Sequence, residues 1–315
     1  MNKAAVQLDI VVVSYNTREL TLEALRSVYE ETTQTTFNLI VVDNNSDDGS
    51  ADAIEQAFPQ LTLIRSPRNL GFSGGVNLSA KYLKSDYLLL LNPDTVILDS
   101  AIDTLYAFAH KKPANGIWGG ITLNDDGSLN THNAWCKPST LTLLFNALGL
   151  NEIFSTSRIF NRANYGNWLR DTEYEIDMLQ GSFFLTLRSL WEQLDGLDET
   201  FFMYGEECDF CLKAIQNGYR PIVTPDARII HHGGASEVNR SDRTVKLLKS
   251  KVELVNRHSS SWEKPLHRAL ILFYVFNKTM TLRLLSFISS KNKTQATEWN
   301  NILMDRKAWL KGWQQ

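Results

Sequence analysis

The sequence predicts an α/β protein with a doubly wound, mostly parallel sheet and a mainly helical C-terminal extension. Between residues 8 and 95, apolar runs rich in β-branched residues alternate with segments of helical periodicity, which is typical of this class. The run at residues 87–91 is wholly apolar, as expected of a strand covered by helices on both faces. Polar or acidic residues follow three of these runs, at the edge where open α/β sheets bind ligands.

Each element is predicted from its local pattern. Strands are expected at 8–14, 37–43, 61–65 and 87–91, and the intervening helices at about 20–28, 50–58 and 76–84. The pattern then predicts a helix at 99–111, a hairpin at 117–133, strand character at 175–187, helices at 188–194 and 206–217, and a short strand at 222–224. Residues 135–175 show no regular pattern and are expected to cross over the site. The chain beyond residue 234 is expected to be mainly helical.

Composition points to a reducing compartment. The 315 residues, 43% of them hydrophobic, suffice for a substantial core and about two domains. Three cysteines form no disulfide framework, and Cys208 and Cys211 lack the second pair that a structural zinc site needs. The N-terminus shows no secretory segment, and the longest apolar run, residues 269–276, is too short to span a membrane. We therefore expect a cytoplasmic protein.

The net charge of −3 conceals an uneven distribution. Residues 240–315 contain 15 Lys and Arg against 5 Asp and Glu, a balance of +10, whereas residues 1–239 contain 17 against 30, a balance of −13. A basic tail on an acidic body indicates an anionic partner for the tail. Because the basic residues are interspersed with a strongly apolar helical pattern, an anionic membrane surface suits this tail better than nucleic acid, which we do not expect as a partner.

The apolar residues of the tail recur at helical spacing. They are Leu266, Leu270, Phe273, Phe276, Met280, Leu284 and Phe287. Such a stripe is typical of a basic amphipathic helix at a membrane surface, but it is also wide enough to pack on the body of the protein or on a second subunit in a homodimer. The sequence leaves these alternatives open.

Polar residues end the first two expected strands. Ser14, Tyr15 and Asn16 follow the first strand, and Asp43 follows the second. A carboxylate at position 43 can accept hydrogen bonds from ribose hydroxyls or a base edge. An Asx turn and helix cap over residues 43–50 explain the same pattern equally well.

A glycine-rich segment runs from Arg68 and Asn69 through Gly71 to Asn77. Glycines let the backbone approach a ligand closely, and the N-terminus of the following helix favours an anion such as a diphosphate. The segment has neither the spacing of a dinucleotide-binding loop nor that of a P-loop. Its position after a strand and beside Asp43 makes it a candidate phosphate-binding loop.

The segment Asn92-Pro93-Asp94 follows the wholly apolar strand. Pro93 fixes the turn so that Asn92 and Asp94 can face the same way, and their oxygens suit Mg²⁺ or Mn²⁺ held between a carboxylate and a diphosphate. A Pro-Asp turn that caps a helix is the alternative. His231 follows the last expected strand and is a candidate to complete a metal site near Asp94.

Three acids, Glu206, Glu207 and Asp209, open an expected helix. The helix macrodipole favours carboxylates at this end and explains any one of them. Three acids within four residues exceed what capping needs. Crowded carboxylates raise one another's pKa, which is how a general base is tuned toward neutrality.

Taken in order, these motifs resemble those of the family 2 inverting nucleotide-sugar glycosyltransferases, which have the GT-A fold. The resemblance rests on VVSYN at 12–16, VVDNNS at 41–46, NLGFSGGVN at 69–77, LLNPD at 90–94, GSFF at 181–184, FFMYGEECD at 201–209 and HHGGAS at 231–236. It covers about residues 8–260. Within the family, the chain is most similar to bacterial rhamnosyltransferases of O-antigen, capsule and exopolysaccharide synthesis.

The resemblance implies a role for each candidate residue. The nucleobase and ribose would be bordered by Ser14, Tyr15, Asn16 and Asp43, and the rest of the nucleotide by Arg68, Asn69, Gly71 and Asn77. The divalent ion, Mg²⁺ or Mn²⁺, would be held on the diphosphate by Asp94, with Asn92 in the first position of the family's D-x-D motif and His231 rather than His232 as a further contact. The acceptor side would be shaped by Gly181 and Ser182, and the catalytic base would be Glu207.

The resemblance also implies a domain organisation and a reaction. A catalytic domain at 1–239 would contain a nucleotide-sugar half at about 1–115 and an acceptor half at about 116–239, followed by the basic, amphipathic extension at 240–315. The reaction would move L-rhamnose from dTDP-rhamnose to a hydroxyl of a glycan or polyprenyl-linked saccharide, with UDP-galactofuranose or a UDP-hexose as alternative donors. The extension would hold the enzyme peripherally on the cytoplasmic face of the inner membrane.

Two positions depart from the family pattern. Neutral Asn92 replaces the first acid of D-x-D, which predicts weak or relaxed use of the metal. Glu207 stands where the family usually has Asp, and its longer side chain leaves Glu206 and Asp209 as alternative bases.

Two other functions compete with this one. A sugar-1-phosphate nucleotidyltransferase would carry a glycine-rich, basic loop after the first strand, whereas residues 14–18 are Ser-Tyr-Asn-Thr-Arg. A non-catalytic carbohydrate-binding or scaffold protein on the same fold would have no need of Asp94 or the acid cluster, and both are intact.

Overall fold

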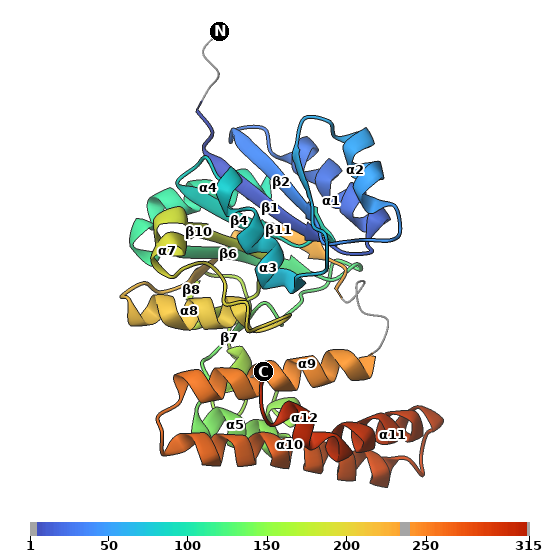
Figure 1. Ribbon diagram of the computed structural model, residues 1–315. Coiled ribbons are helices and arrows are strands. Elements are labelled where there is room, and N and C mark those ends of the chain that lie inside the picture. Colours follow the sequence, from blue (N-terminus) through green and yellow to red (C-terminus); the bar gives the residue numbers. More distant parts are fainter. Residues whose placement is uncertain (1–4, 234–239, 314–315) are drawn as a thin grey trace. The chain divides into compact units, whose positions relative to one another are not determined.

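The computed structural model describes residues 5–233 and 240–313, so residues 234–236 of the last motif lie outside the described part (Figure 1). The chain forms two compact units. Unit 1 comprises Met1–Trp135 and Arg170–Ser236, and unit 2 comprises Cys136–Leu169 and Glu237–Gln315. Residues 136–169 group with the C-terminal helices in unit 2, and the expected catalytic domain at 1–239 stays a prediction.

Unit 1 contains the alternating strands and helices. Its strands are β1 (Leu8–Ser14), β2 (Phe37–Asp43), β3 (Thr62–Arg65), β4 (Tyr87–Leu91), β5 (Thr95–Ile97), β6 (Ile117–Leu123), β7 (Ala134–Trp135), β8 (Tyr174–Glu175), β9 (Met178–Leu179), β10 (Phe183–Leu187) and β11 (Ile222–His231). Its α-helices are α1 (Arg18–Glu31), α2 (Ser50–Ala57), α3 (Gly71–Leu78), α4 (Ala101–Lys111), α7 (Arg188–Gln193) and α8 (Glu206–Gln216).

The main sheet has the strand order β3-β2-β1-β4-β10-β6-β11-β5, with β8 paired to β11 (Figure 1). Strands β1 to β4 are parallel, β10 runs antiparallel between β4 and β6, and β11 is parallel to β6. The chain moves outward from β1 to β3 and then returns to β4 on the other side of β1. This is a topological switch point, beyond which α/β proteins bind ligands. The expected α/β class with a mostly parallel sheet is confirmed.

Helices cover both faces of this sheet. Val12 is buried in a cluster that includes residues of α1, α2 and α4. Successive strand residues point to opposite faces, so Val13 faces the other side. There Gly75 of α3 approaches so closely that an added Cβ would lie 2.8 Å from the Val13 side chain. Phe184 of β10 packs edge-on against Phe210 of α8, with ring centroids 5.9 Å apart. The continuous apolar runs of the strands follow from this double cover.

Four parts of the chain differ from expectation. The expected hairpin at 117–133 is β6 followed by a single antiparallel bridge between Leu123 and Leu129. The expected strand at 222–224 continues to His231, because a register shift between Val223 and Arg228 lets it pair with β6 again. β5 was not expected, since three residues are too few to show a period. Residues 136–169, expected to be irregular, contain two helices of unit 2.

A buried carboxylate joins α4 to the loop before β2. Asp103 is 6% exposed, and its oxygens accept hydrogen bonds from the backbone N–H groups of Thr33, Gln34 and Thr35 at 2.9, 3.1 and 2.8 Å. In sequence Asp103 is only one acid in the first turn of a helix. Its three partners lie about seventy residues earlier, so only the folded chain reveals them.

We expect Asp103→Ala to lower the free energy of unfolding by ~2–4 kcal/mol, because it removes three hydrogen bonds and leaves backbone donors without partners. Urea unfolding followed by circular dichroism measures this change. The control is Asp52→Ala, which removes an exposed ion pair with Arg65 and should cost less than ~1 kcal/mol. Equal effects of the two substitutions would contradict the bracing role of Asp103.

Unit 2 is helical. It contains α5 (Thr140–Ala147), α6 (Leu150–Ile153), α9 (Arg240–His258), α10 (Glu263–Leu285), α11 (Ser290–Met304) and α12 (Arg306–Trp309). Its core gathers Val252 of α9, Val275 of α10, Ile302 of α11 and Trp309 of α12. Asn277 of α10 donates a hydrogen bond to the last carbonyl of α5 at 2.9 Å, which explains why residues 136–169 belong with the C-terminal helices. No helix in the described ranges combines the length and apolar character needed to cross a bilayer.

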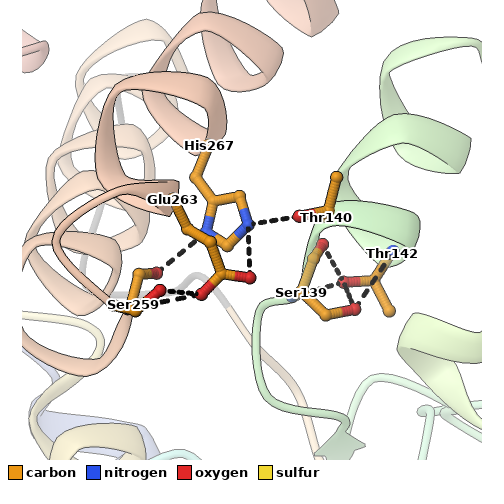
Figure 2. A network of polar contacts seen from close by, with 7 residues as sticks. Ser139, Thr140, Thr142, Ser259, Glu263 and His267 are labelled. Atoms are coloured by element: carbon orange, nitrogen blue, oxygen red, sulfur yellow. Dashed lines mark hydrogen bonds and ion pairs between the residues drawn. The ribbon is translucent and has the colours of Figure 1, made fainter.

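A buried histidine connects three segments of unit 2 (Figure 2). His267 is 1% exposed; its Nε2 lies 2.9 Å from the hydroxyl of Thr140, and its Nδ1 lies 2.8 Å from that of Ser259. Burial lowers the pKa of His267, an effect that the Glu263 carboxylate, 4.0 Å away, only partly offsets. The ring is therefore harder to protonate in the folded protein than in the unfolded chain.

This predicts a pH dependence of stability. Because the unfolded chain binds the proton more readily, the contribution of neutral His267 is complete above the unfolded pKa of about 6.5 and falls as the pH drops toward the lower folded pKa. We expect the free energy of unfolding to decrease more steeply between about pH 7.5 and about pH 5.5 in the wild type than in His267→Gln, which cannot titrate there. Urea titrations at both pH values measure the slopes, and His110→Gln, which removes an exposed histidine, should leave the wild-type slope unchanged.

Candidate active site

The carboxyl ends of β1 and β2 form the first part of the candidate site. Ser14 and Asp43 are register partners, and the next residue, Asn44, donates its backbone N–H to the Ser14 carbonyl at 2.8 Å. The buried Ser14 hydroxyl hydrogen-bonds with the hydroxyl of Thr21 at 2.9 Å, so this side chain secures the start of α1. Ser14 thus borders the site through its backbone.

Asp43 contains a buried acceptor without a partner. The side chain is 4% exposed; Oδ2 accepts the Ser46 N–H at 3.2 Å, whereas Oδ1 is buried with no hydrogen-bond partner. A buried acceptor left unpaired costs free energy, so a ligand hydroxyl or N–H that reached Oδ1 would recover it. The Asx turn expected as an alternative explains one oxygen of Asp43 but not the other.

The loops after β1 and β2 are joined by Asn16. This residue has a positive φ of 53°; its backbone N–H donates to the Ser46 hydroxyl at 3.0 Å, and its Oδ1 accepts the Asp47 N–H at 2.9 Å. Tyr15 beside it is half-buried. The amide of Asn16 therefore shapes the rim, and the half-buried ring of Tyr15 lies next to it in the chain.

The glycine-rich loop is held mainly from inside the protein. Asn44, a residue that the sequence did not single out, donates from Nδ2 to the Gly71 carbonyl and to Asn69 Oδ1, and accepts the Leu70 N–H at its own Oδ1. The Gly71 N–H donates to Asn69 Oδ1 at 2.9 Å, and the next N–H, that of residue 72, donates to the Phe202 carbonyl at 3.0 Å. Three N–H groups at and just before the start of α3 are thus occupied within the protein, and the expected anion site there stays a prediction.

Gly71 is required at its position for two reasons. Its φ is +72°, and a Cβ added there would lie 2.0 Å from the carbonyl oxygen of Phe202. A side chain would therefore push this loop away from the segment that precedes α8. Arg68 is exposed just before the loop, and its carbonyl accepts the Ser66 hydroxyl at 2.7 Å.

Asn77 braces the loop between α7 and α8. Its Nδ2 donates to the Leu197 carbonyl at 2.7 Å and to Glu199 Oε1 at 3.1 Å, and its Oδ1 accepts the Leu197 N–H at 3.0 Å. Both amide atoms are therefore committed to the loop between α7 and α8. These contacts make Asn77 a support of that loop, and its implied place along the nucleotide stays a prediction.

Asn92, Asp94 and His231 meet in space although 137 positions separate Asp94 from His231 in sequence. The Nε2 atom of His231 lies 3.2 Å from Asp94 Oδ1 and 3.2 Å from Asn92 Nδ2. Asp94 is 6% and His231 7% exposed. Burial alone would raise the pKa of Asp94, but the hydrogen bond and charge of His231 outweigh it and hold this pKa below its ordinary value. Asp94 is therefore a carboxylate at neutral pH.

The donor atoms at this point fit a divalent cation. Two ligands that meet an ion at right angles and at ~2.1 Å are about 3.0 Å apart, close to the distance between Asp94 Oδ1 and His231 Nε2. Within residues 5–233 and 240–313, no three His, Cys, Asp or Glu side chains form a metal-binding cluster. Mg²⁺ and Mn²⁺ sites that use one or two protein ligands complete their shell with substrate phosphates and water. His232 points elsewhere, with Nδ1 2.7 Å from Asp125 Oδ1.

The acids at the start of α8 have three different environments. Glu207 is 9% exposed, and its Oε2 accepts the Gly205 N–H at 3.2 Å. Burial raises its pKa, although backbone hydrogen bonds, including one from Gly181, partly offset this. Glu206 is 4% exposed with Oε2 unpartnered, and burial followed by the charge of Glu207 raises its pKa well above the usual range. Asp209 is 1% exposed and pairs with Lys213 at 2.7 Å.

Gly181 and Ser182 connect these acids to the metal candidates. A Cβ added at Gly181 would lie 3.6 Å from the ring of Phe72 and 3.7 Å from Glu207 Cβ, so Gly181 lies between the glycine-rich loop and α8. The Ser182 carbonyl accepts the Asn92 N–H at 3.2 Å, while the Ser182 hydroxyl donates to Gln180. A continuous chain of contacts therefore links the ends of β1, β2 and β4 with α8 and the end of β11.

The structure thus brings most of the predicted residues to one edge of the sheet. Two are engaged elsewhere: Asp209 pairs with Lys213, and Asn77 binds the loop before α8.

Two residues that shape the site were not predicted from the sequence. Asn44 directly follows Asp43 and fixes three points of the glycine-rich loop, and its position right after a strand was the available signal. Phe202 lies in the FFMYGEECD motif, but the motif does not indicate that its backbone carbonyl accepts the N–H of residue 72.

Known proteins match both the sequence and the fold. The family model described as Glycosyl transferase family 2 matches residues 9–194, more than half of the chain. The chain is 27% identical over 279 residues to the N-acetylglucosaminyl-diphospho-decaprenol L-rhamnosyltransferase of Mycobacterium tuberculosis, covering 84% of this chain and 89% of that protein. It is 26% identical over 212 residues to Rhamnosyltransferase WbbL of Escherichia coli, covering 64% of this chain and 75% of that protein.

Among solved structures, the mannosyltransferase PcManGT of Pyrobaculum calidifontis, in complex with GDP-Man and Mn²⁺, superposes with a TM-score of 0.61 at 14% identity, covering 98% of this chain and 88% of that one. S. aureus TarS in complex with UDP gives a TM-score of 0.53 at 13% identity, covering 96% and 91%. These likenesses confirm the expected GT-A-type fold. Together with the family match over residues 9–194, they lead to one conclusion: the chain belongs to glycosyl transferase family 2.

Proposed function

We propose that this glycosyltransferase is an inverting enzyme that moves L-rhamnose from dTDP-rhamnose to a hydroxyl of a lipid-linked saccharide during synthesis of a bacterial surface polysaccharide. The observation that carries the proposal is the similarity, along 84% of this chain, to a protein named as a rhamnosyltransferase with a decaprenol-linked acceptor. The rhamnosyltransferase of Escherichia coli supports the same donor sugar. A peripheral location at the cytoplasmic face of the membrane is part of this proposal and rests on the cysteine content and the basic tail.

In the proposed reaction, the sheet edge binds the donor nucleotide. The unpartnered Oδ1 of Asp43 accepts a hydrogen bond from the ribose or the base, next to the rim made by Tyr15 and Asn16. Asp94 and His231 would hold Mg²⁺ or Mn²⁺, with Asn92 beside them. When bound, this ion would neutralise the charge that develops on the diphosphate. The first N–H groups of α3 are already hydrogen-bonded within the protein. In this proposal the bound ion therefore neutralises the diphosphate charge in their place.

Glu207 is the proposed base, and its surroundings distinguish it from its neighbours. Its carboxylate is oriented by backbone N–H donors and lies against Gly181, on the side proposed for the acceptor. Glu206 has the strongly raised pKa of an acid that keeps its proton, and Asp209 is neutralised by Lys213. The Glu207 carboxylate therefore has a fixed orientation and a pKa raised toward neutrality, and general-base catalysis requires both. It would take the proton of the acceptor hydroxyl as that oxygen attacks the anomeric carbon and the nucleoside diphosphate departs.

Replacement of the base should separate turnover from binding. We expect Glu207→Gln to lose ~10²–10⁴-fold in kcat, because a general base contributes a factor of this size, while nucleotide binding is retained. In the wild type, kcat should fall as the pH drops through the raised pKa of Glu207, since only the carboxylate can accept the proton. Initial rates across pH measure kcat, and thermal shift with the nucleoside diphosphate measures binding. Glu192→Gln, on the surface of α7, is the control, and near-normal turnover of Glu207→Gln would assign the base to Glu206.

A panel of nucleotide sugars tests the donor and the metal. We expect dTDP-rhamnose to be consumed in a reaction that stops on chelation of divalent ions, and Asp94→Ala to lose at least ~10²-fold in kcat/KM because it removes the carboxylate that holds the ion. Asp126→Ala, in an exposed turn, should behave as the wild type. Preferential turnover of UDP-galactofuranose or a UDP-hexose would overturn the donor, and full activity in chelator would overturn the metal site. Silence with every donor and metal would favour a carbohydrate-binding role.

A further inference from the structure

Helix α10 has two apolar faces. His267, Ile271, Val275 and Thr279 recur every four residues and are buried within unit 2. A second set, also at helical spacing, lies on nearly the opposite side of the helix and remains at the surface. This set comprises Ala269, Phe273, Phe276, Met280 and Leu284, of which Phe273 is 41%, Phe276 47% and Leu284 72% exposed. The apolar stripe expected from the sequence therefore includes residues that burial in unit 2 does not explain.

The outer face continues into a groove and a turn. Phe273 and Phe276 line a groove of about 430 Å³ together with Leu303 and Met304, which extends the apolar surface onto α11. After α10 ends, Phe287 is 91% and Ile288 is 78% exposed. We call this surface, from Ala269 to Ile288, the outer face of α10.

The turn after α10 is ordered, so its apolar side chains are held outward. The Ser286 N–H donates to the Arg283 carbonyl at 3.3 Å and the Ile288 N–H to the Leu285 carbonyl at 3.0 Å. Asn292 of α11 donates a further bond to the Leu285 carbonyl at 3.2 Å. Together with the groove, Phe287 and Ile288 extend one apolar surface along α10, and it is such a continuous surface that indicates a partner.

Basic residues outnumber acidic ones in the segment that carries the outer face. Residues 264–297 contain six Lys and Arg and no Asp or Glu. Two of them, Lys291 and Lys293, follow the exposed turn in the first turn of α11, and Arg283 precedes it. An apolar surface among cations matches an anionic lipid bilayer, in which acyl chains receive the apolar side chains and headgroups receive the charges. A second copy of the chain fits poorly, because a two-fold contact would place the same cations opposite one another.

We propose that the outer face of α10 binds an anionic lipid bilayer, with Phe287 and Ile288 inserted between the lipids and Arg283, Lys291 and Lys293 at the headgroups. The binding places the protein where lipid-linked acceptors lie, but it requires no sugar transfer. It can therefore be tested whether or not the proposed rhamnose transfer is correct.

Flotation of the full-length protein with phosphatidylcholine vesicles containing increasing phosphatidylglycerol, without donor or acceptor, measures the partition coefficient. We expect wild-type binding to rise with the phosphatidylglycerol content and to fall with salt. The double variant Phe287→Ser with Ile288→Ser should partition at least about tenfold less, since burying one large apolar side chain accounts for that factor. Lys291→Glu with Lys293→Glu should lose the dependence on phosphatidylglycerol.

The matched control is Ile159→Ser with Leu169→Ser, which removes two apolar residues of unit 2 that are 65% and 71% exposed. This variant should float as the wild type does, and unchanged thermal unfolding should show that all variants are folded. Equal flotation of the wild type and the Phe287/Ile288 variant would overturn the proposal. So would a wild-type dimer in light scattering that the same variant converts to a monomer, since the outer face would then be an interface between two copies.

Discussion

The site depends on the position of β4 between a parallel and an antiparallel neighbour. Leu91 is paired with Val12 of β1 on one side and with Phe183 of β10 on the other. The carboxyl ends of β1 and β4 and the start of β10 must therefore meet at one sheet edge. The polar residues that end β1 and β4 and the Gly181-Ser182 step before β10 converge there as a consequence of strand register.

The same edge concentrates buried polar atoms that lack partners. Among the described residues, Asp43 Oδ1 and Glu206 Oε2 are such atoms at or beside the site. A buried acceptor without a hydrogen bond is costly, so a ligand donor at Asp43 Oδ1 or a proton at Glu206 would recover free energy. Rigidity comes from different residues. Asn44 holds the glycine-rich loop, Asn77 holds the loop before α8, and both use their amides fully inside the protein.

In unit 2, helix α10 has one buried and one exposed apolar face. The stripe through Ile271 and Val275 completes a helical core with α9 and α11. The opposite stripe, through Phe273 and Phe276, and the exposed turn at Phe287 add nothing to that core. The sequence left core packing and surface binding open, and the structure shows core packing on one face of α10 and an exposed apolar surface on the other.

The sequence by itself determined the fold class, the strands β1 to β4 and the edge at which Asp43 and Asp94 lie, because these depend on local apolar runs and on residues that directly follow them. It could not reveal that Asp103 holds a loop about seventy residues away or that Asn77 faces the loop at Leu197, since these contacts join segments with no shared local pattern. It also could not separate the two faces of α10. A helical period of 3.6 residues shows which apolar positions share a face of the helix, but only the packing of neighbouring helices decides which face is buried.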